Sequence, residues 1–241
     1  MLPWPDYINV ACLALLAGAA MPIGAMAARF DLMHPAFLGP KTRHFIVAFG
    51  GGALISAVAL VLVPDGVRKL DPLTATLCFS AGGVFFYLLQ RQLRKLKSTA
   101  GQLVAMLSDF IPEAIALGTA FAVGEHTGFL LALLMVLQNL PEGFNAYEEL
   151  AAKNTTSPKR ILWMFAALAL AGPVAGLSGY FWFSHLTQVV AGIMLFASAG
   201  ILYLVFDDVA PDSKVDDSGL PALGGVAGFM LGLLGNMLIT G

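Results

Sequence analysis

The sequence predicts an all-α integral membrane protein with eight transmembrane helices. Its 241 residues are 58% hydrophobic and 12% charged, and this charge is about half of what a soluble domain of the same size carries. Apolar stretches of about 20 residues, the length that crosses a bilayer as a helix, follow one another along almost the whole chain. We therefore expect residues 1–241 to form a single transmembrane domain, with no separate soluble domain.

The eight expected spans differ in their charged residues. Six contain no Asp, Glu, Lys or Arg, and the other two, the fourth and the fifth, contain acidic residues. In chain order the spans are Ile8–Ala28, Phe45–Val63, Leu73–Leu89, Gly101–Val123, Gly128–Leu150, Ile161–Phe183, Val189–Phe206 and Leu220–Ile239. The first span is too long for a cleaved signal peptide, and no basic residue precedes it.

The basic residues predict the orientation in the membrane. Eleven of the 13 Lys and Arg residues fall in or beside the loops that follow spans 1, 3, 5 and 7, whereas only Arg68 and Lys69 lie on the other side. Because Lys and Arg gather in cytoplasmic loops, we expect these four loops in the cytoplasm and both termini outside. The protein is then a multi-pass protein, and we expect it in the inner membrane of the cell.

A proline followed by an acidic residue occurs four times. The motifs are Pro64-Asp65-Gly66, Pro112-Glu113-Ala114, Pro141-Glu142-Gly143 and Pro211-Asp212-Ser213. They belong to spans 2, 4, 5 and 7, and spans 2 and 7, like spans 4 and 5, would cross the membrane in opposite directions. Their recurrence on antiparallel helices indicates inverted repeats, a common plan in transporters.

Two of these prolines lie in the middle of a span. Pro112 and Pro141 lack a backbone N–H, so each is expected to break or kink its helix and to free a carbonyl group. Such backbone is tolerated at membrane depth where protein or water covers it. A kink that merely improves helix packing is the alternative interpretation.

The acidic residues beside these prolines form the candidate site. Asp109 and Glu113 are four residues apart, as are Gln138 and Glu142, so each pair shares one helix face, and Asn139 lies next to Gln138. Neither span contains Lys or Arg, so buried carboxylates there are either protonated or balanced by a mobile cation. A hydrogen-bonded network that only joins the two helices is the alternative.

The ligand types narrow the choice of cation. Carboxylate and amide oxygens favour Mg²⁺, Ca²⁺ or Mn²⁺ and bind Zn²⁺ or iron less selectively. Other residues would lie at the mouths of an ion path: Asp65 and His126 outside, Asp208 and Asp212 inside. Acid-lined mouths concentrate cations, although solvated charges at helix ends would give the same pattern.

With these residues identified, the chain resembles the ZIP (Zrt/Irt-like) family of divalent metal transporters. The resemblance is specific at "DFIPEAIALG" and "QNLPEGFNA" and looser in spans 2 and 7. By motif position it implies a main metal site of Asp109, Glu113, Gln138 and Glu142, with Asp109 and Gln138 replacing the usual histidines. Of the family's second metal site only Asn139 could act as a ligand, because Phe110 and Gly172 stand at its other positions.

The resemblance also implies a function and a mechanism. The protein would carry zinc, or a similar ion such as Mn, Fe, Cd or Co, toward the cytoplasm by alternating access. Spans 1, 4, 5 and 6 would be the transport part and spans 2, 3, 7 and 8 the scaffold. A homodimer would suit the family, whereas an enzyme activity and a nucleic-acid partner are not expected. The alternatives are a metal-binding sensor or scaffold that does not transport, and an intramembrane metal-dependent hydrolase, which the absence of histidine within the spans disfavours.

Overall fold

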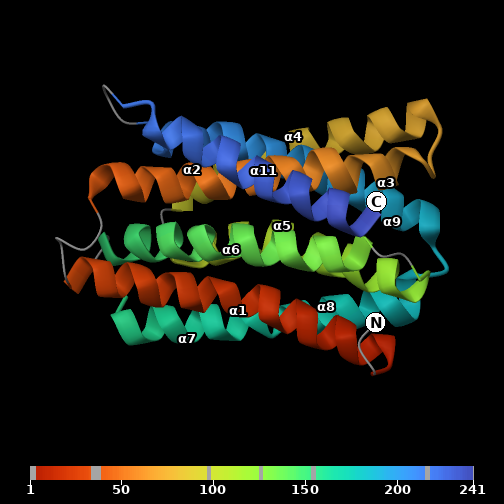
Figure 1. The fold of residues 1–241 in the computed structure, drawn as a ribbon, viewed down its shortest axis with the longest axis horizontal. Helices are drawn as coiled ribbons and strands as arrows, with labels where there is room; N and C mark the ends of the chain where they lie inside the picture. The colour runs from red at the N-terminus through yellow and green to blue at the C-terminus, as the bar shows by residue number, and fades with distance from the viewer. Residues whose placement is uncertain are drawn as a thin grey trace.

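The computed structural model describes residues 4–33, 39–96, 99–124, 127–152, 156–214 and 218–240. These parts of the chain fold into helices without a strand, and the helices lie side by side along one long axis (Figure 1). Eight helical segments among them are long and apolar enough to cross a membrane. The predicted fold class is confirmed at this level. Both ends of the chain lie at the same end of the bundle in Figure 1.

The helices correspond to the expected spans. In chain order the elements are α1 (Asp6–Met33), α2 (Pro40–Ala57), η1 (Val58–Leu62), α3 (Val63–Val67), α4 (Pro72–Leu96), α5 (Thr99–Ala122), α6 (Thr127–Ala152), α7 (Pro158–Ala169), α8 (Ala171–Ser178), η2 (Gly179–Phe183), α9 (Thr187–Leu204), η3 (Val205–Val209), α10 (Ala210–Asp212) and α11 (Leu220–Thr240). The three η segments are π-helical turns. In spans 2 and 7 a π turn lies between two α-helical segments, whereas span 6 is interrupted at Leu170 and ends in a π turn.

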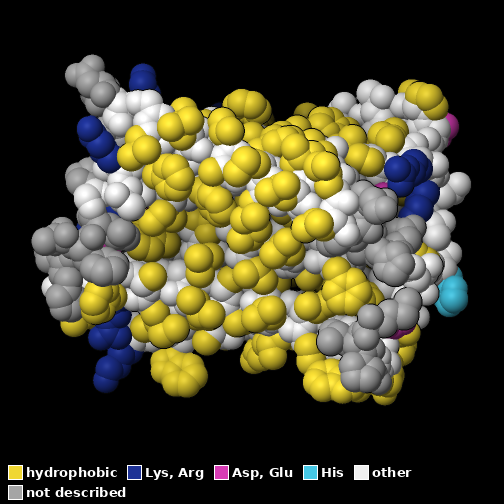
Figure 2. Space-filling view, in the orientation of Figure 1, with side chains coloured by type: hydrophobic (Ala, Val, Ile, Leu, Met, Phe, Trp, Pro, Cys, Tyr) yellow, Lys and Arg dark blue, Asp and Glu magenta, His cyan; other side chains and the backbone are white. Residues whose placement is uncertain are grey.

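The surface of the bundle suits a lipid environment. Figure 2 shows hydrophobic side chains over the middle of the visible face and Lys and Arg side chains toward both ends. Large apolar side chains are strongly exposed, among them Trp163 at 77% and Leu238 at 85%. Apolar patches of this extent are rare on soluble monomers. The exposure therefore supports a multi-pass membrane protein.

Two π turns come directly before prolines. In span 2 the Val63 N–H bonds to the Val58 carbonyl ahead of Pro64, and in span 7 the Ala210 N–H bonds to the Val205 carbonyl ahead of Pro211. Each π turn has five residues and follows an α-helix of 18 residues. Spans 2 and 7 therefore share the same local order of elements. π turns of this kind occur frequently at functional sites.

The expected breaks at Pro112 and Pro141 do not occur. Both prolines lie inside continuous helices, α5 and α6, as Pro22 does in α1. Each proline removes one backbone hydrogen bond, but ending the helix inside the apolar core would leave several polar groups without partners. A continuous helix is the less costly outcome, so the acidic side chains keep their positions on regular helix faces.

Close backbone contact fixes α1 against α6 beside the candidate site. A Cβ atom on Gly143 would overlap the Met21 carbonyl oxygen, and one on Gly24 would overlap the Leu140 carbonyl oxygen. Only glycine allows such an approach of two helices. Gly143 directly follows Glu142, so this contact fixes the height of Glu142 relative to α1.

Helix packing follows a simple pattern. On one side of the bundle, α1 packs on α6, α7 and α8, and α5 packs on α8 and η2. On the other side α2 packs on α11, and α4 packs on α9. Contacts between α2 and α6, α5 and α9, and α6 and α11 connect these two sets of helices. The predicted ligands on α5 and α6 thus lie next to the boundary between the sets.

Candidate metal site

A cavity of about 770 Å³ leads into the bundle from one end. Its mouth is lined by Glu149, Asp208 and Asp212, close to the ends of α6 and α10. Its deep part is lined by Asp109, Gln138 and Glu142. The cavity therefore connects one end of the bundle with three of the predicted metal ligands, and acidic side chains lie at both of its ends.

The three deep residues come from two adjacent helices. Asp109 lies on α5, and Gln138 and Glu142 lie one turn apart on α6, as their spacing predicted. Asp109 and Gln138 are 4% and 2% exposed, and Glu142 is partly buried. Polar side chains in the wall of a largely closed cavity are well placed to replace part of an ion's water shell.

Glu113 takes a different position. Its side chain is 1% exposed and does not line the cavity. Both carboxylate oxygens of Glu113 accept hydrogen bonds from the Gln138 side-chain amide, with Nε2–oxygen distances of 2.7 and 2.6 Å. The structure thus pairs Glu113 with Gln138 across α5 and α6.

Asp109 has a backbone partner. Its Oδ1 accepts a hydrogen bond from the Phe110 N–H at 2.9 Å. This bond holds the carboxylate close to the α5 backbone, and the bulky Phe110 ring behind it is fully buried.

Asn139 connects two helices. Its Nδ2 donates a hydrogen bond to the Ala17 carbonyl oxygen of α1 at 3.0 Å, and its side chain is 1% exposed. It does not line the cavity. In this arrangement Asn139 stabilises the packing of α6 on α1, whereas its predicted role as a ligand is untested.

No basic side chain balances the acids of the candidate site. Across the described residues, no salt bridge involves Asp109, Glu113 or Glu142. No three His, Cys, Asp or Glu side chains in the described ranges are arranged to hold one metal ion. A closed shell of three carboxylates is therefore not present in this conformation.

The predicted mouth residues fall into three groups. Asp208 and Asp212 line the cavity mouth, and Asp208 Oδ2 accepts a hydrogen bond from Gln90 Nε2 at 3.5 Å. Asp65 lies at the opposite end of the bundle, where it is 5% exposed and contacts Arg68 at 3.5 Å. His126 lies outside the described residues.

The cavity does not continue to the opposite end. Beyond Glu142, toward Asp65, the same helices carry almost fully buried apolar side chains, including Leu62, Leu117 and Leu134. Close packing of these side chains leaves no room for an ion with its water shell. The structure is thus open at the end of the bundle where α1, α4, α6 and α10 end, and packed at the other.

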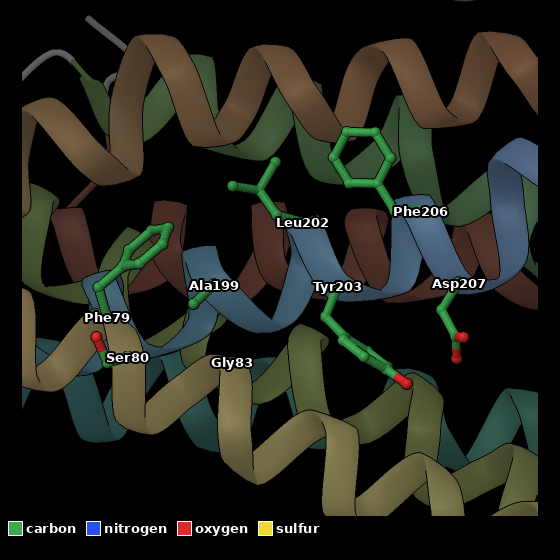
Figure 3. A pocket seen from close by; sticks show the side chains of 8 residues that line it. All are labelled: Phe79, Ser80, Gly83, Ala199, Leu202, Tyr203, Phe206 and Asp207. Carbon is green, nitrogen blue, oxygen red and sulfur yellow. The ribbon is translucent and has the colours of Figure 1, made fainter.

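A second hollow is a groove of about 560 Å³ between α4 and α9. Figure 3 shows Tyr203 of α9 and Asp207 of η3 on the side of span 7 that faces α4, and Tyr203 packs edge-on against Tyr87. The groove is mostly apolar in its lining and includes none of the predicted metal ligands. It is therefore separate from the candidate site.

Sequence reasoning missed an ion-pair cluster near the cavity mouth. Arg43 at the start of α2 contacts Asp31 of α1 (Nη2–Oδ2, 2.5 Å) and Glu148 of α6 (Nη1–Oε1, 3.4 Å). Arg43 had been interpreted only as an indicator of orientation. An acid at the end of the first span, next to a basic residue at the start of the second, was the available signal.

No protein-family model matches this chain, and no curated protein matches it significantly. The resemblance to the ZIP family therefore rests on the sequence motifs alone.

Proposed function

We propose that this protein transports divalent metal cations across the membrane and resembles ZIP transporters in doing so. The main support is a cavity that is open at one end of the bundle and leads from its acidic mouth to Asp109, Gln138 and Glu142. The carboxylates of Asp109 and Glu142 form no salt bridge with a basic side chain in the described chain. A passing dication would supply the missing positive charge at a depth where an unbalanced carboxylate is costly.

The open end of the cavity supports a direction. It lies on the side that the positive-inside rule assigns to the cytoplasm. A cavity open to the cytoplasm and packed on the outside is what one of the two end states of an alternating-access transporter requires. We propose that the ion enters from outside and is released through the acidic mouth into the cytoplasm, and that the membrane is the inner membrane.

Two features support a moving transport part. The shared α-helix, π-turn and proline order of spans 2 and 7 supports inverted repeats. The three most extensive helix interfaces fall within the set α1, α5, α6, α7 and α8 (α1 with α6) and within the set α2, α4, α9 and α11 (α2 with α11, and α4 with α9). These are the sets proposed as transport part and scaffold. Since α4 has only 11% of its span buried, we place the contact of a homodimer on the scaffold.

The substrate is proposed as zinc or a similar ion, with Mn, Fe, Cd and Co as the other candidates. The oxygen ligands favour the harder ions of this group. The purified protein in proteoliposomes, loaded with a metal-sensitive dye, would be tested against a panel of these metals. Wild type should show flux of at least one metal, and Asp109→Ala should show none. Metal binding without flux would instead indicate the sensor or scaffold alternative.

A further inference from the structure

We propose that Arg43 forms a latch, through its ion pairs with Asp31 and Glu148, that holds the transport part against the scaffold while the cavity is open at its present end. This inference rests on the proposed function, because it takes from there the movement of one part against the other. It concerns side chains outside the candidate metal site and assigns them a role in the equilibrium between the two end states of transport.

The ion pairs of Arg43 cross the boundary between the two sets of helices. Arg43 belongs to α2 of the scaffold, whereas Asp31 of α1 and Glu148 of α6 both belong to the transport part. The hydrogen bond from Asn139 to the Ala17 carbonyl, by contrast, joins two helices of the transport part. Arg43 therefore connects two parts that the proposed movement would displace against each other.

The latch lies at the end of the bundle where the cavity opens. Asp31 and Glu148 lie near the ends of α1 and α6, and Arg43 lies in the first turn of α2. Val47, one turn further along α2, and Glu149, next to Glu148, line the cavity. The ion pairs thus lie beside the cavity mouth, where they can hold the two parts in the position that keeps the mouth open.

The geometry of the ion pairs ties them to one position of the two parts. Arg43 Nη2 lies 2.5 Å from Asp31 Oδ2, and Arg43 Nη1 lies 3.4 Å from Glu148 Oε1. Asp31 is short and fully buried, so its carboxylate moves with α1. A slide by one helical turn is about 5.4 Å, and it would carry this pair beyond the roughly 4 Å of an ion pair. A contact made in only one of two states shifts the equilibrium toward that state.

The boundary also contains contacts of a kind that can shift. Within the scaffold, α2 and α11 meet backbone to backbone, since a Cβ atom on Gly228 would overlap the Phe49 carbonyl oxygen. Across the boundary, a Cβ atom on Gly50 of α2 would instead meet the ring of Pro141 on α6. Small sliding movements of packed helices occur at interfaces of side chains. The Arg43 ion pairs are thus a specific hold on a boundary that permits sliding.

The test measures how often the opposite end of the bundle opens. Ala116 lies two turns beyond Asp109 on the same face of α5 and is 1% exposed. A cysteine introduced by Ala116→Cys should therefore react from that end only when the end opens. Cys12→Ser and Cys78→Ser remove the native thiols. The measured quantity is the rate of labelling by a membrane-impermeant maleimide in right-side-out membrane vesicles.

Removing the latch should speed up this labelling. Arg43→Gln abolishes both ion pairs and should raise the rate by about 5-fold or more, because the rate follows the population of the minor state. Lys41→Gln, the matched control, makes the same change in charge at an exposed position of the same helix and should leave the rate unchanged. An unchanged rate in Arg43→Gln contradicts the latch.

A double variant separates a latch from a role in packing alone. In Arg43→Gln combined with Asp31→Asn, the buried side chain at position 31 carries no charge, so part of the lost melting temperature should return. The labelling rate should nevertheless stay raised by about 5-fold or more, because the ion pairs are still absent. If the rate returns to its original value together with the melting temperature, Arg43 serves packing only and the inference is wrong. The double variant also carries the test if Arg43→Gln alone does not fold.

The outcomes distinguish a failure of the latch from a failure of the proposed function. Labelling requires no metal, so an unchanged rate contradicts the latch and leaves the transport proposal standing. If the wild-type protein in proteoliposomes shows no flux of any divalent metal, the transport proposal itself is contradicted, whatever the labelling rate is.

Discussion

Two groups of acidic side chains in this protein differ in whether a basic side chain of the described chain lies beside them. Near the cavity mouth, the fully buried Asp31 and the partly buried Glu148 share the guanidinium group of Arg43. At the middle of the bundle, Asp109, Glu113 and Glu142 have no such cation among the described residues. The first group has a permanent counter-ion supplied by the chain.

The difference separates a structural role from the proposed transport role. A covalently attached cation cannot leave, so the Arg43 cluster joins α1, α2 and α6 and serves packing. A site whose counter-ion must arrive and depart needs the opposite, carboxylates without a basic neighbour beside a water-accessible path. We therefore expect substitutions in the first group to change stability and substitutions in the second to change metal uptake. Asp71, which lies outside the spans, serves as a third acid for comparison.

The largest effect is expected at the group without a cation. Glu142→Gln should abolish metal uptake into proteoliposomes, a loss of about 100-fold or more, because it removes a charged ligand while keeping shape. The size-exclusion profile in detergent should stay unchanged. Asp71→Asn, the same change in charge at an exposed site, is the matched control and should transport normally. Uptake by Glu142→Gln at the wild-type rate would contradict the site.

The second effect concerns stability at the Arg43 cluster. Arg43→Met removes the guanidinium group that Asp31 and Glu148 share, and it should lower the free energy of unfolding by about 3 kcal/mol. Thermal unfolding in detergent measures this change. Adding Asp31→Asn should restore part of the loss, because the buried side chain then carries no charge. If the single variant melts like wild type, the cluster has no structural role.

The smallest effect is expected at Asp71. Its carboxylate accepts hydrogen bonds from the Thr74 and Leu73 backbone N–H groups at the start of α4. Hydrogen bonds, with the Thr74 side chain contributing most, hold the pKa of Asp71 below its ordinary value of 3.8.

A lowered pKa in the folded state means that the ionised form stabilises the fold above the ordinary pKa. This contribution is lost as pH falls through the lower, folded-state value. Asp71→Asn should therefore melt slightly below wild type at neutral pH, and the difference should vanish in strong acid. A difference in melting temperature that grows on acidification would contradict a stabilising role of the ionised Asp71 carboxylate.

Much of the fold followed from the sequence because apolar runs of membrane length are unambiguous. The span ends were less accurate. Span 7 was expected at Val189–Phe206, but its helical segments run from Thr187 to Asp212. The π turns were not foreseen, since an extra residue per turn leaves no mark in composition.

The site was predicted as a set of residues but not as a set of roles. Spacing places Glu113 and Gln138 on inner helix faces, yet it does not show that one amide would satisfy both Glu113 oxygens. Nor does it show that Asn139 would turn to the Ala17 carbonyl. These hydrogen bonds depend on how α1, α5 and α6 pack together. That packing is set by close contacts of glycines such as Gly143 with residues that are distant in sequence.

The π turn before Pro211 changes the direction in which side chains point around the axis of span 7, so residues before and after it face different neighbours. It acts as a one-residue insertion, and one residue corresponds to a rotation of about 100° around a helix axis. Side chains before Val205 can therefore face α4 while Asp212 beyond it faces the cavity. Deleting a single residue from Val205–Val209 would turn the carboxylate of Asp212 out of the ion path, although every side chain of the metal site would still be present.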